Sequence, residues 1–258
     1  MKFSTIFLIC FAVINTFSYA QNSKNNSYEI DPKILLKDFQ HWWNYTYRVV
    51  NLSSDFKAID SKSKIISKES FLKLLLTGNY IPLGVNSNEP SEVYKLYKLK
   101  PSDDADIKST IKDLVQTEYE RFKREGTEIP KFNFTDLNGK VYTNENTKGK
   151  TLVLKCWFIH CTACVAEMPA LNQMVAKYKN REDILFISLA YDSRAQLKEF
   201  LNRKVFDYAV IPVKINFMEK LKISAYPTHF IINKSGIITK IVDRQEHLAK
   251  ALIKEIGQ

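Results

Sequence analysis

The pattern of apolar and polar positions changes character near residue 126. Before it, apolar residues recur mainly at helical spacing. After it, short continuous apolar runs alternate with amphipathic stretches and with turn residues. The pattern therefore predicts a mainly helical region over residues 21–126, followed by a mixed α/β region over residues 127–258.

The first region is expected to contain three helices and a few short strands. Asp31-Pro32 favours a helix start, because Asp caps the free N–H groups and Pro fits the first turn. Gly126 ends the last helix and Pro130 prevents it from resuming. The expected elements are, in order, helix 31–43, a strand beginning near Tyr45 and Tyr47, helix 67–78, strands 80–83 and 93–99, and helix 103–123.

The second region opens with the dipeptide Asn138-Gly139 between two short apolar runs, which is a strong hairpin signal. Strands and helices then alternate to the end of the chain. The expected elements are strand 151–157, helix 162–179, strand 184–189, helix 194–201, strand 208–213, a helical turn over 217–221, strands 229–232 and 237–242, and helix 244–256. This order predicts a mixed sheet covered by helices.

Composition excludes disorder of the whole chain and gives no support for nucleic-acid binding. The chain has 258 residues, of which 45% are hydrophobic and 12% aromatic, so a packed core is available. The formal net charge is +10, but the basic residues are scattered and form no arginine cluster. We interpret the charge as favouring solubility, with a mild preference for acidic partners or membrane surfaces.

Residues 1–20 have the features of a secretory signal. Lys2 supplies the positive start, an apolar stretch follows over residues 6–17, and Ser18-Tyr19-Ala20 offers a cleavage site. An uncleaved anchor is the alternative, although the apolar run is short for a membrane span. Cys10 lacks the preceding small residue of a lipoprotein signal. Cleavage would leave Cys156, Cys161 and Cys164, with the thiols outside the cytosol.

The motif Cys161-Thr162-Ala163-Cys164 lies where a buried strand passes into an amphipathic helix. Free N–H groups and the positive end of the helix dipole favour a thiolate at such a position. Cys164 follows one turn later, so the pair can form a dithiol/disulfide couple. Half of a zinc site with His160, or two buried thiols, are the alternatives. A structural zinc needs four ligands, and the chain has no second cysteine pair.

Two prolines extend the redox interpretation. Pro169 should kink the helix that follows the motif, and Tyr226-Pro227-Thr228 precedes an apolar strand, where a cis bond is expected. These features are similar to the thioredoxin fold. The string Trp-x-x-x-Cys-x-x-Cys-x-x-Glu-Met-Pro, residues 157–169, resembles the TlpA/ResA-like thiol–disulfide oxidoreductases, which are exported bacterial proteins. The resemblance covers about residues 127–258, and residues 21–125 are similar to the extra N-terminal region of Bacteroidetes-type members.

The resemblance implies roles for four residues. Cys161 corresponds to the nucleophile, Cys164 to the resolving thiol and Pro227 to the cis-proline that aligns the substrate backbone. Glu167 corresponds to the acidic residue that, in some members, lines the pocket and assists proton transfer. The alternative for Glu167 is an exposed carboxylate on the helix surface.

The chain also departs from the family pattern. His160 replaces the usual Trp before the first cysteine and, if protonated, would favour the Cys161 thiolate. The alternative for His160 is an exposed ring that only shapes the rim of the site. Lys155 stands where a polar Asn or Asp is usual, and we expect it to extend from the strand end toward solvent. The alternative is that it acts as a base in place of that residue. Cys156 is expected to be a small buried residue, and His229 to be structural.

Together these features predict an exported, periplasmic thiol–disulfide oxidoreductase. The resemblance implies that it reduces protein disulfides and is recharged by a membrane electron donor. No cofactor or metal is implied, and the oligomeric state is not indicated. A thiol peroxidase of the thiol-specific antioxidant type shares the fold, but typically sets Pro and Thr before its cysteine. A copper carrier of this fold normally spaces its cysteines by three residues rather than two.

Overall fold

The computed structural model describes residues 31–86 and 91–257. The expected signal at residues 1–20 lies outside these residues. Within the described part, no helix is both long and apolar enough to cross a membrane.

The N-terminal region is a small α/β unit rather than a mainly helical one. It has a four-stranded mixed sheet of order β2-β1-β4-β3, beside four helices. The elements are α1 (Pro32–Leu35), α2 (Phe39–Val49), β1 (Lys57–Ile59), β2 (Ile65–Ile66), α3 (Lys68–Leu75), β3 (Tyr80–Gly84), β4 (Val93–Lys98) and α4 (Ala105–Phe122). The expected strands correspond to β3 and β4. Strands β1 and β2 are too short to show an alternating pattern in the sequence.

The first expected helix is divided, and the strand expected near Tyr45 and Tyr47 is wrong. The carboxylate of Asp38 accepts a hydrogen bond from the backbone N–H of His41 at 2.9 Å, so it caps a new helix, α2. This helix continues through both tyrosines. The hydroxyl of Tyr45 accepts a hydrogen bond from the N–H of Gly84 at 2.7 Å, which ties α2 to strand β3.

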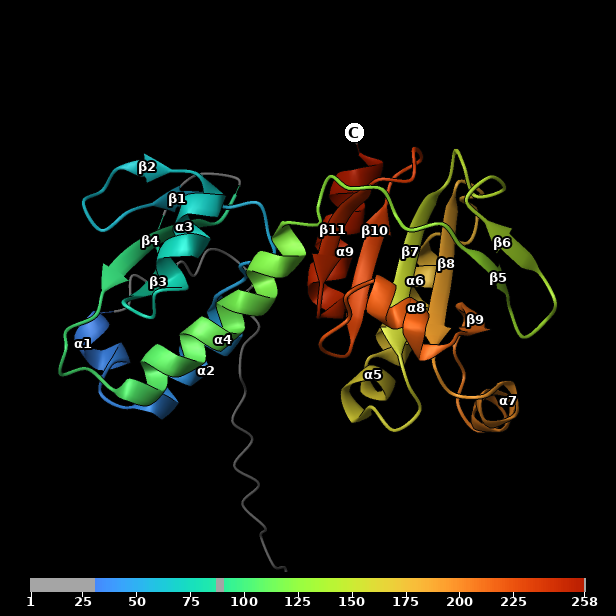
Figure 1. The fold of residues 1–258 in the computed structure, drawn as a ribbon, viewed down its shortest axis with the longest axis horizontal. Coiled ribbons are helices and arrows are strands. Elements are labelled where there is room, and N and C mark those ends of the chain that lie inside the picture. Colours follow the sequence, from blue (N-terminus) through green and yellow to red (C-terminus); the bar gives the residue numbers. More distant parts are fainter. Residues whose placement is uncertain (1–30, 87–90, 258) are drawn as a thin grey trace, which may run out of the picture.

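The C-terminal half confirms the expected thioredoxin-like arrangement (Figure 1). Its five-stranded sheet has the order β11-β10-β7-β8-β9, in which β7, β8 and β9 are parallel while β10 and β11 are antiparallel to their neighbours. A hairpin of β5 (Asn133–Thr135) and β6 (Val141–Thr143) precedes it. The remaining elements are β7 (Thr151–Trp157), α5 (Thr162–Ala166), α6 (Met168–Lys177), β8 (Ile184–Ala190), α7 (Arg194–Leu201), β9 (Ala209–Pro212), α8 (Ile215–Lys220), β10 (Thr228–Ile232), β11 (Ile238–Val242) and α9 (Gln245–Ile256).

The central strand β7 is buried along its whole length and divides the core in two. Val153 and Trp157 pack on the face covered by α6 and α9. Leu154 and Cys156 point to the opposite face, which α8 helps to cover. Cys156 is a free and fully buried thiol, as expected, and burial raises its pKa to about 12.

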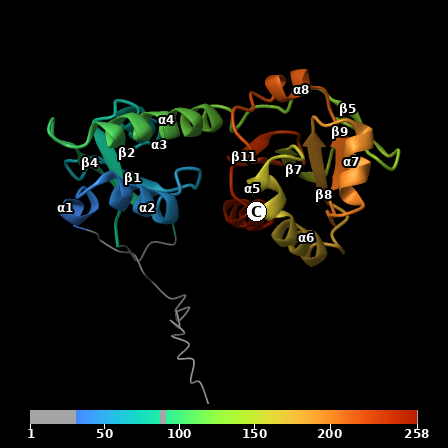
Figure 2. The same ribbon diagram turned by 90° about the horizontal axis from the view of Figure 1, so that it is seen from below.

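The N-terminal region has its own core and is joined to the second half by ionic contacts. All buried residues of that core lie between Leu35 and Val115. The ammonium of Lys240 on β11 lies 2.8 Å from Asp55 and 3.1 Å from Glu125, and Arg121 on α4 lies 3.3 Å from Asp243. Figure 2 shows α4 leading from the N-terminal elements toward β11. The division into two domains at residue 126 stays a prediction.

This ionic contact should make stability depend on pH through Asp55. Burial raises the pKa of Asp55, but hydrogen bonds and charges from Lys240 and Lys254 outweigh it and lower the pKa from 3.8 to about 2. The unfolded state then binds more protons, so this contribution is complete above about pH 4 and is lost as the pH falls through about 2. We expect Asp55→Asn to cost about 1 kcal/mol near neutral pH, after allowance for solvent screening of this half-exposed side chain. Urea unfolding of both proteins should show this difference shrinking toward pH 2; a constant difference would contradict it.

Candidate active site

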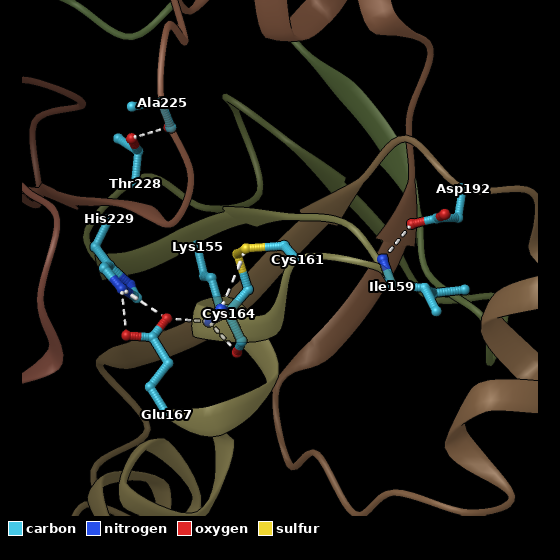
Figure 3. Close-up of a disulfide and its surroundings, with 9 residues drawn as sticks. All are labelled: Lys155, Ile159, Cys161, Cys164, Glu167, Asp192, Ala225, Thr228 and His229. Atoms are coloured by element: carbon cyan, nitrogen blue, oxygen red, sulfur yellow. Dashed lines mark hydrogen bonds and ion pairs between the residues drawn. A yellow bond between two sulfur atoms is a disulfide. The ribbon is translucent and has the colours of Figure 1, made fainter.

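Strand β7 delivers the two cysteines of the motif to the start of helix α5. Cys161 is the N-cap of α5, and it forms a disulfide with Cys164, with the two Cα atoms 5.2 Å apart. Cys161 retains 8% of its surface exposed, whereas Cys164 is fully buried. The Sγ atom of Cys161 also accepts a hydrogen bond from the N–H of Cys164 at 3.2 Å (Figure 3). One cysteine that keeps some exposure and one that is fully buried, within one helical turn, fit a reactive thiol and its resolving partner.

The loop before β10 carries the expected cis-proline. The peptide bond between Tyr226 and Pro227 is cis. The hydroxyl of Thr228 donates a hydrogen bond to the carbonyl of Ala225 at 2.7 Å, which closes the loop (Figure 3). Pro227 lines the same cleft as Ala163 of the motif. The structure therefore brings Pro227 and the motif together, as the sequence predicts.

His160 is exposed, next to Cys161 at the rim. It makes no hydrogen bond or ion pair with another residue of the described ranges. The preceding residue is better anchored, because the N–H of Ile159 donates to the carboxylate of Asp192 at 2.9 Å (Figure 3). The backbone before the motif is thus held from the loop between β8 and α7, while the His160 side chain stays accessible.

Three ionisable side chains meet beneath the motif. Antiparallel pairing places His229 of β10 directly opposite Lys155 of β7, so both side chains emerge on the same face of the sheet. Glu167, at the junction where helix α5 ends and helix α6 begins, lies against both side chains. Its carboxylate lies 3.0 Å from Nε2 of His229 and contacts Nζ of Lys155, which also donates to the carbonyl of Cys164 at 3.0 Å (Figure 3).

Burial determines the charge state of this cluster. Burial lowers the pKa of His229 below its usual 6.5, so the ring is neutral at neutral pH. Burial also lowers the pKa of Lys155, against the opposing charge of Glu167. For Glu167 burial raises the pKa, but the hydrogen bond from His229 and the charge of Lys155 outweigh it and hold the pKa below 4.5. The cluster is therefore an ion pair with a neutral imidazole attached.

One expectation is corrected here, and the contacts of Lys155 and His229 with Glu167 were not predicted. Lys155 does not extend to solvent: its side chain is fully buried and paired. For Glu167 the structure excludes only the alternative, an exposed helix carboxylate, since its side chain is 10% exposed. His229 is buried, as a structural residue would be, but it also contacts Glu167. A lysine inside an apolar strand is the signal that could have revealed the cluster, because a buried ammonium needs a partner.

An aromatic group borders the motif on the other side. The rings of Phe158 and Tyr191 stack with centroids 5.1 Å apart, and Tyr226 meets Phe158 edge-on at 5.3 Å. These contacts join the loop before the motif to the cis-proline loop. Their packing fixes the spacing of the two loops that flank Cys161.

The described residues contain no group of three or more His, Cys, Asp or Glu side chains that could hold a metal ion. The geometry of the site supports thiol–disulfide exchange at Cys161 and Cys164.

Comparison with known proteins agrees with this chemistry. The model of the AhpC/TSA family matches residues 126–241. The thiol–disulfide oxidoreductase ResA of Bacillus cereus is 33% identical over 125 residues, which cover 46% of this chain and 70% of that protein. The thioredoxin-like protein YneN of Bacillus subtilis is 25% identical over 137 residues, which cover 52% of this chain and 78% of that protein.

Among solved structures, a thiol:disulfide interchange protein from a Bacteroides species has 19% identity and a TM-score of 0.46. The alignment covers 52% of this chain and 91% of that one. The relatives thus match about half of the chain, and the family model begins at residue 126.

Proposed function

This chain belongs to the ResA/TlpA-like thiol–disulfide oxidoreductases of the thioredoxin superfamily, and we propose that it is exported to the periplasm, where it reduces disulfides of other proteins. The observation that carries the proposal is the Cys161–Cys164 disulfide at the start of α5, with one sulfur at the rim and the other buried. The apolar start of the sequence, with its cleavage site, supports export.

The reaction begins from the reduced dithiol. The Cys161 thiolate attacks one sulfur of a substrate disulfide, a mixed disulfide forms, and the other substrate sulfur leaves as a thiolate. The Cys164 thiolate then attacks Sγ of Cys161 and releases the second substrate thiol. Two electrons have passed to the substrate, and the enzyme is left with the Cys161–Cys164 disulfide. A membrane electron donor would restore the dithiol.

The surroundings of Cys161 favour its thiolate. Its Sγ accepts the N–H of Cys164 at the helix start, where the helix dipole also favours negative charge. His160 lies next to it in the chain, and its protonated form adds a positive charge. No bond in the structure holds His160 to another described side chain, so its contribution would be electrostatic.

The buried cluster would serve the second step. Cys164 lies in a dry environment that opposes its ionisation, so a nearby proton acceptor and a positive charge both help. Glu167 is the acceptor that we assign. Lys155 binds the carbonyl of Cys164 and holds Glu167 in place. His229 fixes the second edge of the carboxylate.

Pro227 is assigned to the alignment of the substrate backbone, since it faces the same cleft as Ala163. We expect Pro227→Ala to lower kcat/KM for a protein disulfide about tenfold or more, because misplacement of the reacting sulfur is costly. Reduction of hydroxyethyl disulfide, which has no peptide to align, should change much less. Insulin reduction measured beside this small disulfide would show it, and unchanged insulin reduction would remove Pro227 from the site.

The proposed function is tested by titrating the couple against glutathione and by following insulin reduction by the reduced protein. Equilibrium with glutathione gives the potential, for which known couples span roughly −270 to −120 mV. A strongly oxidising potential would reverse the proposed direction. Cell fractionation with an antibody to the chain tests export.

A thiol peroxidase is the second candidate, because the chain matches the AhpC/TSA family model. Ile159-His160 before Cys161 departs from the Pro and Thr that such enzymes typically have there. The rate at which the reduced protein consumes hydrogen peroxide distinguishes a disulfide reductase from a thiol peroxidase. Rapid consumption with slow insulin reduction would favour the peroxidase.

A further inference from the structure

A cleft of about 830 Å³ lies between the N-terminal region and the catalytic half. One wall comes from α2 and α4, and the other from α5, the start of α6 and the start of α9. Figure 1 shows α4 and α9 on the facing sides of the two parts. The volume lies in the range of about 300–1,000 Å³ that is usual for ligand sites. The first wall is formed by residues before residue 126, which lie outside the part of the chain that the family model matches.

The cleft reaches the reaction site. On the catalytic side its lining includes Ala163 of the motif, Ala166 one turn later, Glu167 and the Tyr226-Pro227 peptide. Ala163 and Ala166 are exposed, so the part of this wall that α5 forms is smooth and apolar. A chain that passes Pro227 to place a sulfur on Cys161 would therefore continue into this cleft.

The opposite wall is apolar and aromatic, and it is held in place. Trp43 and Tyr47 are its largest apolar members, and Leu114 lies on the same wall. The guanidinium of Arg244 lies 4.8 Å from the centre of the Tyr47 ring and donates to the Tyr47 carbonyl at 2.8 Å. With the Arg121–Asp243 pair, this contact links α2 and α4 to the beginning of α9. The walls are thus joined across the cleft by specific bonds.

The charge of the cleft is opposite to that of the whole chain. Its lining contains five carboxylates and two arginines, in a protein of formal net charge +10. Both arginines are engaged, Arg121 with Glu118 and Arg244 with Tyr47. Asp113 and Glu246 are exposed and form no ion pair within residues 31–86 and 91–257. A ligand with positive charge would meet carboxylates that are free to pair with it.

We propose that this cleft binds an extended, apolar and lysine- or arginine-containing segment beside the reactive cysteine of the substrate protein. The N-terminal region would thereby select which disulfides are reduced. This inference rests on the proposed function. Apolar walls supply contact area, and the two free carboxylates favour basic over acidic segments through attraction and repulsion.

The test uses two synthetic peptides of equal length, each with one cysteine in a mixed disulfide with nitrothiobenzoate. Leu and Val flank the cysteine in both, with added Lys in one and added Glu in the other. Release of nitrothiobenzoate by the reduced protein in a single turnover gives the rate. We expect the Lys peptide to react about tenfold faster at low ionic strength, with the ratio falling as salt is added.

Variants locate the selectivity. Asp113→Lys with Glu246→Lys should remove the preference for the Lys peptide, whereas Thr117→Trp, which fills the cleft from α4, should slow both peptides. The matched control is Glu199→Lys with Glu219→Lys, which changes the net charge equally at exposed positions outside the cleft. It should keep the preference. All variants should reduce hydroxyethyl disulfide at the rate of the unmodified protein.

The outcomes separate this inference from the proposed function. If the unmodified protein reduces neither peptide nor hydroxyethyl disulfide, the proposed function fails. If the unmodified protein and the variants all reduce the two peptides at equal rates, only the inference is overturned. Selectivity that emerges only on dilution would also overturn it, because the cleft would then hold a second copy of the chain.

Discussion

Cys164→Ser is expected to convert the enzyme into a trap for its substrates, while Cys161→Ser should abolish disulfide reduction. Among the three cysteines of the described residues, only Cys161 reaches the surface, so it is the one that can attack a disulfide of another protein. Without the Cys164 thiol the mixed disulfide cannot be resolved and accumulates. Non-reducing gels of cells that express each variant would show the covalent adducts, and mass spectrometry would identify the trapped protein.

Cys156→Ser is the matched control, because its thiol lies on the opposite face of the sheet from the disulfide. This variant should keep turnover and lose only some stability, since a hydroxyl replaces a fully buried thiol. If Cys164→Ser traps nothing while Cys161→Ser does, the two roles are reversed.

Alkylation gives an independent check of the same assignment. Near pH 6, iodoacetamide should modify Cys161 of the reduced protein well before the other two thiols, because only a thiolate reacts and Cys161 has the helix start and His160 beside it. Burial raises the pKa of Cys156 to about 12, so this thiol should react last. Labelling of Cys156 first would contradict the arrangement.

Local sequence signals were sufficient to predict the main strands, turns and helix breaks of the catalytic half. The run Thr151–Trp157 is a strand with the expected bounds, and Pro169 accompanies a break between two helices near Glu167. Gly139 has a φ of 88° in the hairpin turn, a conformation that the Asn-Gly dipeptide predicts. Each of these features depends on neighbouring residues, which a single sequence displays.

Features that depend on strand register were not accessible in the same way. The cluster beneath the motif needs Lys155 and His229 to be paired across two antiparallel strands, and no local pattern fixes that pairing. The sheet of the N-terminal region was missed in part for a related reason. Strand β1 pairs in parallel with the distant β4, and three residues carry no periodic signal.

The buried ion pair offers the largest expected effect on stability. Lys155→Met leaves the Glu167 carboxylate without its cation at a site that is only 10% exposed, and Glu167→Gln leaves the fully buried Lys155 ammonium without its anion. Each single substitution should cost about 3 kcal/mol of unfolding free energy, because an uncompensated buried charge remains. The double variant should cost at least about 2 kcal/mol less than the sum of the two, since it leaves neither charge behind.

Urea unfolding of the oxidised protein, its two single variants and the double variant measures the coupling free energy between Lys155 and Glu167. The same double-mutant cycle on the exposed pair Glu199–Arg203 provides the control. That pair lies 3.3 Å apart with both side chains more than 70% exposed, so its cycle should give a coupling of less than about 1 kcal/mol. The pH dependence has a defined sign. The pKa of Glu167 is lowered, so its contribution is present at neutral pH and is lost as the pH falls below about 4.5. Additive single effects at neutral pH would mean that Lys155 and Glu167 do not stabilise each other, and the role of Lys155 in holding the carboxylate near Cys164 would then be untenable.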